Sequence, residues 1–165
     1  MKIPIVNEKD EVLCYKERGT EEQMDLYRVS ALWLTNSKGD ILLARRALSK
    51  THDPGKWGPA VAGTVEKNET YESNIIKEVK EELGLEVNLK KNLKTMKHSE
   101  KFKHNHLTQW FTAKIDISEK EINFDKVEVD TVKWFSKKEL SKKVSANPEN
   151  FLTTIKEFVK GKIIF

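Results

Sequence analysis

The stretch from Gly63 to Leu85, GTVEKNETYESNIIKEVKEELGL, is the most informative part of the chain. A glycine-led loop precedes a helix-like run in which Glu78, Glu81 and Glu82 share one helical face, at spacings i, i+3 and i+4. Like charges at this spacing repel, so an ordinary surface helix gains nothing from collecting them. A hard divalent cation among the carboxylates would remove the repulsion, and such a cation is the usual partner of a substrate phosphate.

The pattern around these glutamates predicts a helix from about Thr70 to Leu83. Asn68 or Thr70 can cap its start, and Gly84 can end it. One arc of the helix is apolar and is formed by Ile75, Ile76, Val79 and Leu83. The carboxylates occupy the adjacent arc, so the helix can bury one side in a core and present the carboxylates to a cleft.

The segments before this helix read as short strands. Residues 3–6 and 11–15 surround a polar turn and predict an N-terminal β-hairpin within residues 1–16. Strands are expected at 28–35, 41–45 and 60–65, separated by a glycine-containing turn and by a loop at 47–59.

The segments after the helix continue the mixture of strands and helices. Strands are expected at 86–89, 108–117 and 129–135, and Ser136 opens a capping box for a short helix. A last helix is expected over about 148–160, with its proline at the first position. The whole pattern predicts a single α/β or α+β sandwich.

Composition limits the function classes. The chain has 165 residues, which suits one domain, and its N-terminus is too charged for a signal peptide. Cys14 is the only cysteine, which is consistent with a reducing cytoplasm. The net charge is +4, but the lysines are interleaved with 26 acidic residues, which favours a lysine-rich soluble surface over a nucleic-acid-binding one. No membrane association is expected.

The central stretch resembles the Nudix box, which is a glycine, five residues, a glutamate, seven residues and then R-E-u-x-E-E-x-G-u, with u aliphatic. Gly63, Glu69 and the run KEVKEELGL from Lys77 match every position except one, because the box has arginine where this chain has Lys77. The resemblance covers roughly residues 26–160 and implies a single Nudix domain over residues 1–165. It implies an α/β/α sandwich with a mixed central sheet.

The resemblance also implies an activity, which is hydrolysis of a diphosphate with Mg²⁺ or Mn²⁺. By matching positions, Glu78, Glu81 and Glu82 would bind the metal and the carbonyl of Gly63 would add a ligand. Glu69 would pair with Lys77. The expected substrate is a nucleoside diphosphate derivative or a similar organic pyrophosphate, and a homodimer is a state that the family often adopts.

The general base is left open between two places. Glu81 or Glu82 could accept the proton of the attacking water from the helix. In some Nudix enzymes the base comes from a later loop, and here Glu128 or Asp130 would be that residue.

Three segments resemble a Nudix subgroup similar to isopentenyl-diphosphate isomerase: VNEKDEVLCYKER, ILLARRALSKTHDPGKWG and EVDTVKWFSKKEL. The isomerase would need a cysteine after PGKWG, where this chain reads Pro59 to Gly63 without one, and a metal-binding histidine that is also missing from 27–30. Cys14 is expected to be a packed residue. Isomerase activity is therefore an alternative, and a non-catalytic module that binds nucleotide or RNA is another.

Several other side chains are candidates for substrate or metal contact. Arg45 and Arg46 end a strand, and alternation allows only one of them to face the site. Trp57 and Trp110 could stack on a flat group or simply pack. The histidines form a loose cluster that could bind metal or lie on the surface; they are His98, His104 and His106. Specificity is expected from the loops at 16–26, 47–59 and 97–106.

Overall fold

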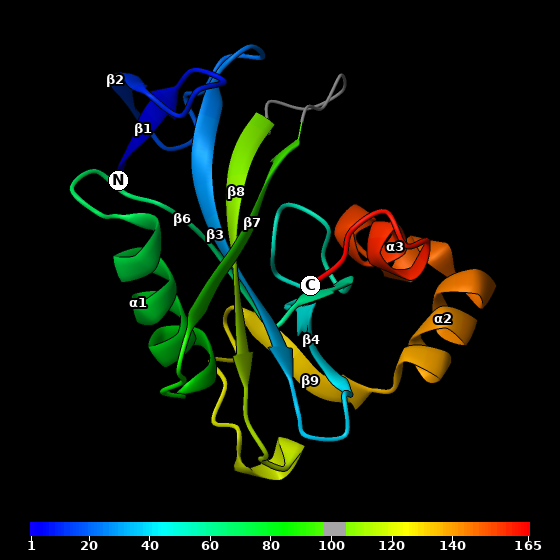
Figure 1. Ribbon diagram of the computed structural model, residues 1–165. Coiled ribbons are helices and arrows are strands. Elements are labelled where there is room, and N and C mark those ends of the chain that lie inside the picture. Colours follow the sequence, from blue (N-terminus) through cyan, green and yellow to red (C-terminus); the bar gives the residue numbers. More distant parts are fainter. Residues whose placement is uncertain (98–104) are drawn as a thin grey trace.

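The computed structural model describes residues 1–97 and 105–165. A mixed β-sheet forms the centre of the molecule, with helices on both sides (Figure 1). α1 (Tyr71–Leu83) covers one side, and α2 (Lys137–Ala146) and α3 (Thr153–Val159) cover the other. The predicted α/β/α sandwich with a mixed sheet is confirmed.

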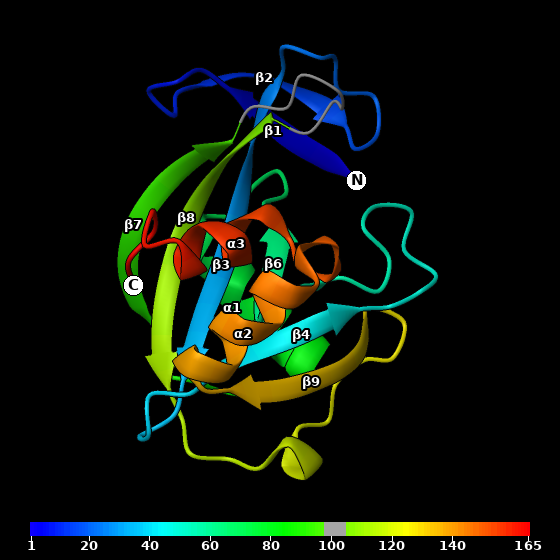
Figure 2. The ribbon, with the colours of Figure 1, turned by 90° about the vertical axis from the view of Figure 1, so that its right-hand side faces the viewer.

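The described residues contain nine strands, and the long β3 is the centre of their pairing. β3 runs parallel to β8 over its whole length and antiparallel to β1 and β6 (Figure 2). β4 pairs with β5 and β9. The bounds are β1 Lys2–Val6, β2 Val12–Glu17, β3 Leu26–Thr35, β4 Ile41–Arg46, β5 Trp57–Pro59, β6 Val61–Thr64, β7 Lys90–Lys97, β8 Asn105–Lys114 and β9 Val129–Phe135.

Alternation along β3 divides the apolar core between the two helical layers. Leu32 and Leu34 belong to a buried cluster with Val79 of α1. Ala31 and Trp33 belong to the opposite cluster, which includes residues of α2 and α3. Both faces of the sheet are therefore buried, and β6 is fixed beside α1 by its pairing with β3.

Capping residues mark both ends of α1. Thr70 and Ser73 form a reciprocal capping box, and Gly84 adopts a left-handed conformation with φ of 63°. One expectation for this helix is wrong: Ile76 is 54% exposed. The buried face instead runs through Asn74, Ile75, Val79 and Leu83.

Two other expected elements differ from the structure. Residues 86–89 form no regular strand, and the strand lies one step later in the lysine-rich β7, which pairs with β8. The last helix, expected over 148–160, is interrupted. Pro148–Asn150 forms a short 3₁₀ turn, and Phe151 is then extended because it forms a bridge with Trp57. The regular helix α3 starts only at Thr153.

The N-terminal hairpin of β1 and β2 is attached to the body through Asp10 in its turn. The carboxylate of Asp10 accepts hydrogen bonds from Arg28 Nε at 2.7 Å and Tyr71 Oη at 3.0 Å, and it pairs with Lys94. These partners come from β3, α1 and β7. The contacts hold the hairpin beside the start of α1, so its ends lie near β6 (Figure 1).

Candidate active site

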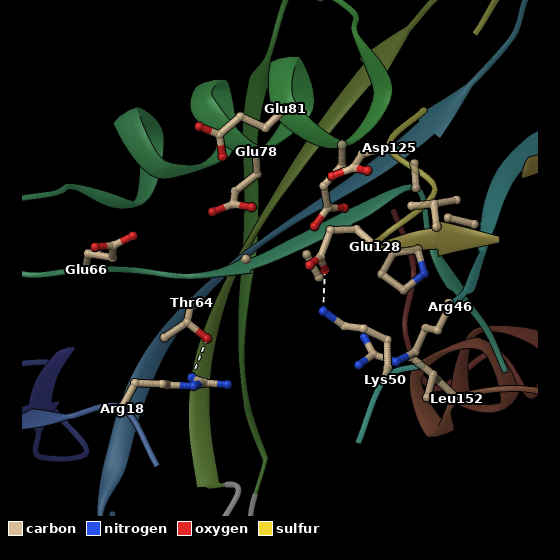
Figure 3. Close-up of a pocket in the computed structure, with 18 of the residues that line it drawn as sticks. Arg18, Arg46, Lys50, Thr64, Glu66, Glu78, Glu81, Asp125, Glu128 and Leu152 are labelled. Carbon is tan, nitrogen blue, oxygen red and sulfur yellow. Dashed lines mark hydrogen bonds and ion pairs between the residues drawn. The ribbon is translucent and has the colours of Figure 1, made fainter. Parts of the chain in front are cut away.

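A cavity of about 470 Å³ lies between α1, β6 and the segment that leads into β9. Acidic side chains line one part of it, and basic side chains line another (Figure 3). The acidic residues are Glu66, Glu78, Glu81, Glu82, Asp125 and Glu128. The basic residues are Arg18, Arg46 and Lys50. The cavity thus brings together the helix carboxylates, Gly63, Glu128 and Arg46 from the sequence-based set.

Gly63 of β6 lies directly against the Glu78 side chain of α1. A Cβ added at Gly63 would lie 2.4 Å from Cγ of Glu78 and 2.8 Å from its Oε1. Real Cβ atoms do not approach other heavy atoms so closely, so any side chain at position 63 would force Glu78 or the β6 backbone to shift. The missing side chain gives the Glu78 carboxylate its place beside the β6 backbone.

Lys77 connects the loop to the helix. Its Nζ lies 2.7 Å from Glu69 Oε1, 3.1 Å from Glu66 Oε1 and 3.6 Å from Glu78 Oε1. Burial opposes ionisation of Glu69, but hydrogen bonds from Lys77 and from the Glu66 backbone N–H hold the pKa of Glu69 below its usual value. The pKa of Lys77 is raised because these carboxylates outweigh the effect of its own burial.

We expect Lys77→Arg to keep or raise turnover. Arginine has five N–H donors and can serve several carboxylates at once, whereas lysine acts as a point charge. The measurement is kcat together with the melting temperature, with Lys80→Arg on the exposed side of the same helix as the control. A large loss of activity in Lys77→Arg alone would show that lysine has a role of its own.

Ionisation of the carboxyl groups in the acidic part of the cavity is unfavourable. Burial raises the pKa of Glu82 to about 8, and the negative charges of Glu78 and Glu128 add to the rise, while Lys50 and Arg46 oppose it. Burial also raises the pKa of Glu78, and the negative charge of nearby Glu81 adds to this rise. These carboxylates therefore resist ionisation when no cation neutralises them.

A prediction for the cation-free protein follows from the pKa of Glu82. The unfolded chain loses this proton near pH 4.3, but the folded protein keeps it up to about pH 8. Between these values the folded state binds more protons, so its stability falls as pH rises. In a chelator-treated sample, we expect Glu82→Gln to flatten the decline of melting temperature between about pH 5 and 8. An identical slope in wild type and variant would contradict the assignment.

The donor set suits a divalent cation, although the side chains are not already gathered around one point. Carboxylates are the ligands that Mg²⁺ and Mn²⁺ prefer. The Glu78 carboxylate beside the Gly63 backbone and the raised pKa of Glu82 fit a site completed by positive charge. Within residues 1–97 and 105–165, no three acidic, histidine or cysteine side chains form a ready metal-binding group.

Four charged residues that line the cavity were missed by sequence reasoning, namely Arg18, Lys50, Glu66 and Asp125. Lys50 forms an ion pair with Glu128, and Arg18 forms a hydrogen bond with Thr64 (Figure 3). Asp125 also lines the cavity, and its backbone N–H donates to the carbonyl of Glu82 at 2.9 Å. Lys50 and Arg18 lie in loops that were expected to set specificity, which was the available signal. Asp125 carries no comparable motif.

Three residues that were candidates from the sequence lie outside the described walls of the cavity, namely Arg45, Trp57 and Asp130. Arg45 points away from them, with its Nε 2.6 Å from Oδ2 of Asp130 and its guanidinium 5.7 Å from the ring centre of Trp57. Trp57 packs edge-on against Phe135, with ring centroids 5.2 Å apart. Arg46 is therefore the arginine of the pair that lines the cavity, and Glu128 rather than Asp130 is the later acidic residue that does so.

The remaining candidates have other surroundings. Trp110 is buried, and its Nε1 donates to Thr95 Oγ1 at 3.0 Å. His106 lies on β8, and its Nδ1 is 2.8 Å from Thr108 Oγ1. His98 and His104 lie outside the described residues. Cys14 is exposed on β2 rather than packed.

The sequence from residue 24 to residue 155 matches the family model of the NUDIX domain. The chain belongs to this family. Over 62 residues the Nudix chain is 40% identical to isopentenyl-diphosphate Delta-isomerase from Escherichia coli O1:K1. This match spans 38% of the chain and about a third (34%) of the length of that curated relative.

Solved structures share the fold of the Nudix chain. The crystal structure of DR0079 from Deinococcus radiodurans superposes with a TM-score of 0.81 at 23% identity, and the match covers 98% of each chain. A MutT NUDIX hydrolase from Burkholderia pseudomallei superposes with a TM-score of 0.66 at 17% identity, over 82% of this chain and 96% of that one. The protein thus has the fold of a Nudix hydrolase. In the part that the structure describes, no helix is both long and apolar enough to cross a membrane.

Proposed function

We propose that this Nudix protein hydrolyses a diphosphate bond in a nucleoside diphosphate derivative or a similar organic pyrophosphate, with Mg²⁺ or Mn²⁺. The observation that carries the proposal is the division of one cavity into two chemical parts. Glu78, Glu81 and Glu82 line the first part, while Arg46 and Lys50 line the second. A diphosphate between them would meet positive charge on both sides once a cation is bound.

The protein's own groups have separate tasks in this reaction. A bound divalent cation would neutralise phosphate charge and lower the pKa of an attacking water. Glu78, Glu81 and Glu82 would hold that cation, with Gly63 leaving room for Glu78. Arg46 and Lys50 would bind phosphate oxygens and keep the phosphorus atoms oriented in the cavity.

The proton of the attacking water needs an acceptor inside the cavity. Glu81, Glu82 and Glu128 remain candidates, because each lines the cavity. Lys50 is paired with Glu128, so a phosphate that draws Lys50 away would release the Glu128 carboxylate for proton transfer. Comparing the pH profiles of Glu81→Gln, Glu82→Gln and Glu128→Gln tests this choice, since loss of the base removes the acidic limb of kcat against pH.

Isomerisation of isopentenyl diphosphate is the second candidate, and the 40% identical segment favours it. The sequence has no cysteine between Pro59 and Gly63, and its single cysteine, Cys14, is exposed on β2 and lies outside the described cavity walls. The chemistry that the isomerase resemblance implies therefore lacks its sulfur in this cavity. Formation of an allylic diphosphate without phosphate release would revive this candidate.

A substrate panel tests the proposed function. The protein is incubated with Mg²⁺ or Mn²⁺ and with nucleoside diphosphates, their derivatives and isopentenyl diphosphate, and phosphorylated products are separated by chromatography. Hydrolysis products are expected from at least one organic pyrophosphate. Tight binding with no turnover of any member would instead favour a non-catalytic nucleotide- or RNA-binding module.

We further propose that residues 1–165 act as one Nudix unit in a reducing cytoplasm, with a homodimer as a state to be tested by light scattering. The N-terminal hairpin packs on β3 and α1 through Asp10. Near the other end, the ring of Phe165 stacks on Trp33, with centroids 4.4 Å apart. Both segments outside residues 24–155 therefore contact the body of the domain.

A further inference from the structure

The N-terminal hairpin places a positively charged side chain, Arg18, in the cavity, although this hairpin precedes the segment that matches the family model. Arg18 directly follows β2, whereas the family match begins at residue 24. Its side chain points into the cavity, and its Nη1 donates a hydrogen bond to Thr64 Oγ1 (Figure 3). Thr64 is the neighbour of Gly63 on β6, so the hairpin reaches the same backbone that faces Glu78.

A second cavity, of about 230 Å³, adjoins the first. The two cavities share part of their walls, namely Arg18, Arg46, Pro59, Ala62 and Leu152. The second cavity is also lined by Tyr27 of β3, His106 of β8 and Thr154 of α3. Arg18 therefore lies where the two cavities meet.

The second cavity has a mixed aromatic and hydrogen-bonding surface. The ring of Tyr27 lies 5.8 Å from the imidazole of His106, measured between centroids. Thr108, whose hydroxyl is 2.8 Å from His106 Nδ1, also lines it. Aromatic rings and hydrogen-bonding side chains therefore lie side by side in this cavity. A nucleoside offers both a flat apolar face and hydrogen-bonding edges.

The guanidinium of Arg18 is oriented but has binding capacity left. It lies 4.9 Å from the ring centre of Tyr27, which holds its plane, and its ion pair with Glu21 is long, at 3.9 Å. Thr64 accepts from one of the five N–H donors that a guanidinium carries, and the Tyr27 hydroxyl is a second hydrogen-bonding partner. A planar guanidinium with further N–H donors suits a phosphate, because it can donate two parallel hydrogen bonds to the phosphate oxygens.

We propose that Arg18 binds the substrate phosphate that carries the nucleoside, and that the nucleoside occupies the second cavity. This inference rests on the proposed function, because it assumes that the diphosphate lies in the first cavity. The chain connecting diphosphate and nucleoside must then pass the junction at which Arg18 stands. Arg18 is thus a substrate-binding residue that sets which end of the substrate enters which cavity.

Equilibrium binding tests the role of Arg18 without requiring turnover. The probe is a methylene-bridged nucleoside diphosphate, measured by titration calorimetry with and without Mg²⁺. We expect Arg18→Ala to weaken binding by about 10- to 100-fold, the usual value of hydrogen bonds to a charged group, and Arg18→Lys to recover part of the loss. The control is Lys16→Ala, which removes a positive charge from the same hairpin. Lys16 pairs with Asp25 at 2.6 Å and lies outside the described walls of both cavities.

A cavity-filling variant tests the place of the nucleoside. Thr154 lines the second cavity and lies outside the described walls of the first, so Thr154→Trp would fill the second one alone. We expect this variant to lose affinity for the nucleoside probe and to keep its affinity for methylenediphosphonate, which has no nucleoside. Equal weakening of both probes, or of neither, would overturn the assignment of the second cavity.

The outcomes separate this inference from the proposed function. Binding of the probe that depends on Arg18, without hydrolysis of any diphosphate in the panel, would refute the hydrolase and leave the binding assignment standing. Hydrolysis with unchanged probe affinity in Arg18→Ala would refute the role of Arg18 and leave the hydrolase standing. A wild-type protein that does not bind the probe would refute the inference.

Discussion

Glu82→Gln is expected to lower kcat by roughly 10²- to 10⁴-fold, the range associated with a group that transfers a proton or holds the catalytic charge. Glu82 lines the cavity with Glu78 and Glu128, and burial, together with the charges of these two neighbours, raises its pKa to about 8. The amide keeps the shape of the side chain but cannot be a negatively charged ligand or a base. The measurement is kcat on the best substrate of the panel at saturating Mg²⁺.

The control for this variant is Glu72→Gln, which removes an exposed carboxylate from the first turn of the same helix. Its activity should equal that of the wild type. Glu82→Gln should also remain folded, and in the cation-free protein above about pH 8 it should melt higher than the wild type, because a buried charge has been removed. Equal activity of Glu82→Gln and wild type would show that the assignment of the metal site is wrong.

Gly63→Ala is the second variant with a large expected effect, on both activity and stability. The new Cβ would stand 2.4 Å from Cγ of Glu78, so the glutamate must leave its place or β6 must move. Overpacking of this kind costs about 1–3 kcal/mol of stability. We expect kcat to fall by about 100-fold or more, because a misplaced group can cost that much. Thermal unfolding and kcat are measured on the same sample.

A double-variant cycle identifies the cause of that loss. In a Glu78→Ala background the clash partner is absent, so Gly63→Ala should cost less stability there than in the wild type. Equal costs in the two backgrounds would place the strain elsewhere, for example in the pairing of Gly63 with Ser30 of β3.

The part of the site that was predictable from sequence is the part built from local spacing. Glu78 and Glu82 are one helical turn apart, and Gly63 is tied to them by the loop that Lys77 and Glu69 hold. Such geometry depends on helix periodicity and on a few capping residues, which a reader can recognise in one stretch of chain. The same is true of the expectation that only one of Arg45 and Arg46 faces the site, which follows from strand alternation, whereas the structure was needed to show that Arg46 is the one that lines the cavity.

The rest of the site and of the fold depends on contacts between segments that are far apart in the sequence. Lys50 and Glu128 are far apart in sequence and form an ion pair across the cavity. Arg18 reaches the site because Asp10 attaches the hairpin to partners from three other elements. Phe151 breaks the expected last helix because its backbone pairs with Trp57. None of these contacts has a periodicity or a motif, since tertiary context decides them.

The lysine-rich β7 is a strand that its sequence pattern does not predict. Its sequence, KKNLKTMK, lacks the dense apolar alternation that predicts a strand, yet it pairs with β8 along the edge of the sheet. Backbone hydrogen bonds to a well-formed neighbour stabilise it, and its charged side chains discourage further strands from adding to that edge.

The attachment of the hairpin through Asp10 has a consequence for how substrate choice could evolve. The carboxylates stand on α1, within the family domain, whereas Arg18 stands on a short N-terminal segment that precedes it. Mutations in that segment could exchange one recognised ligand for another and leave the reaction centre intact. Substitutions confined to the first 23 residues would then alter selectivity without touching the carboxylates of α1.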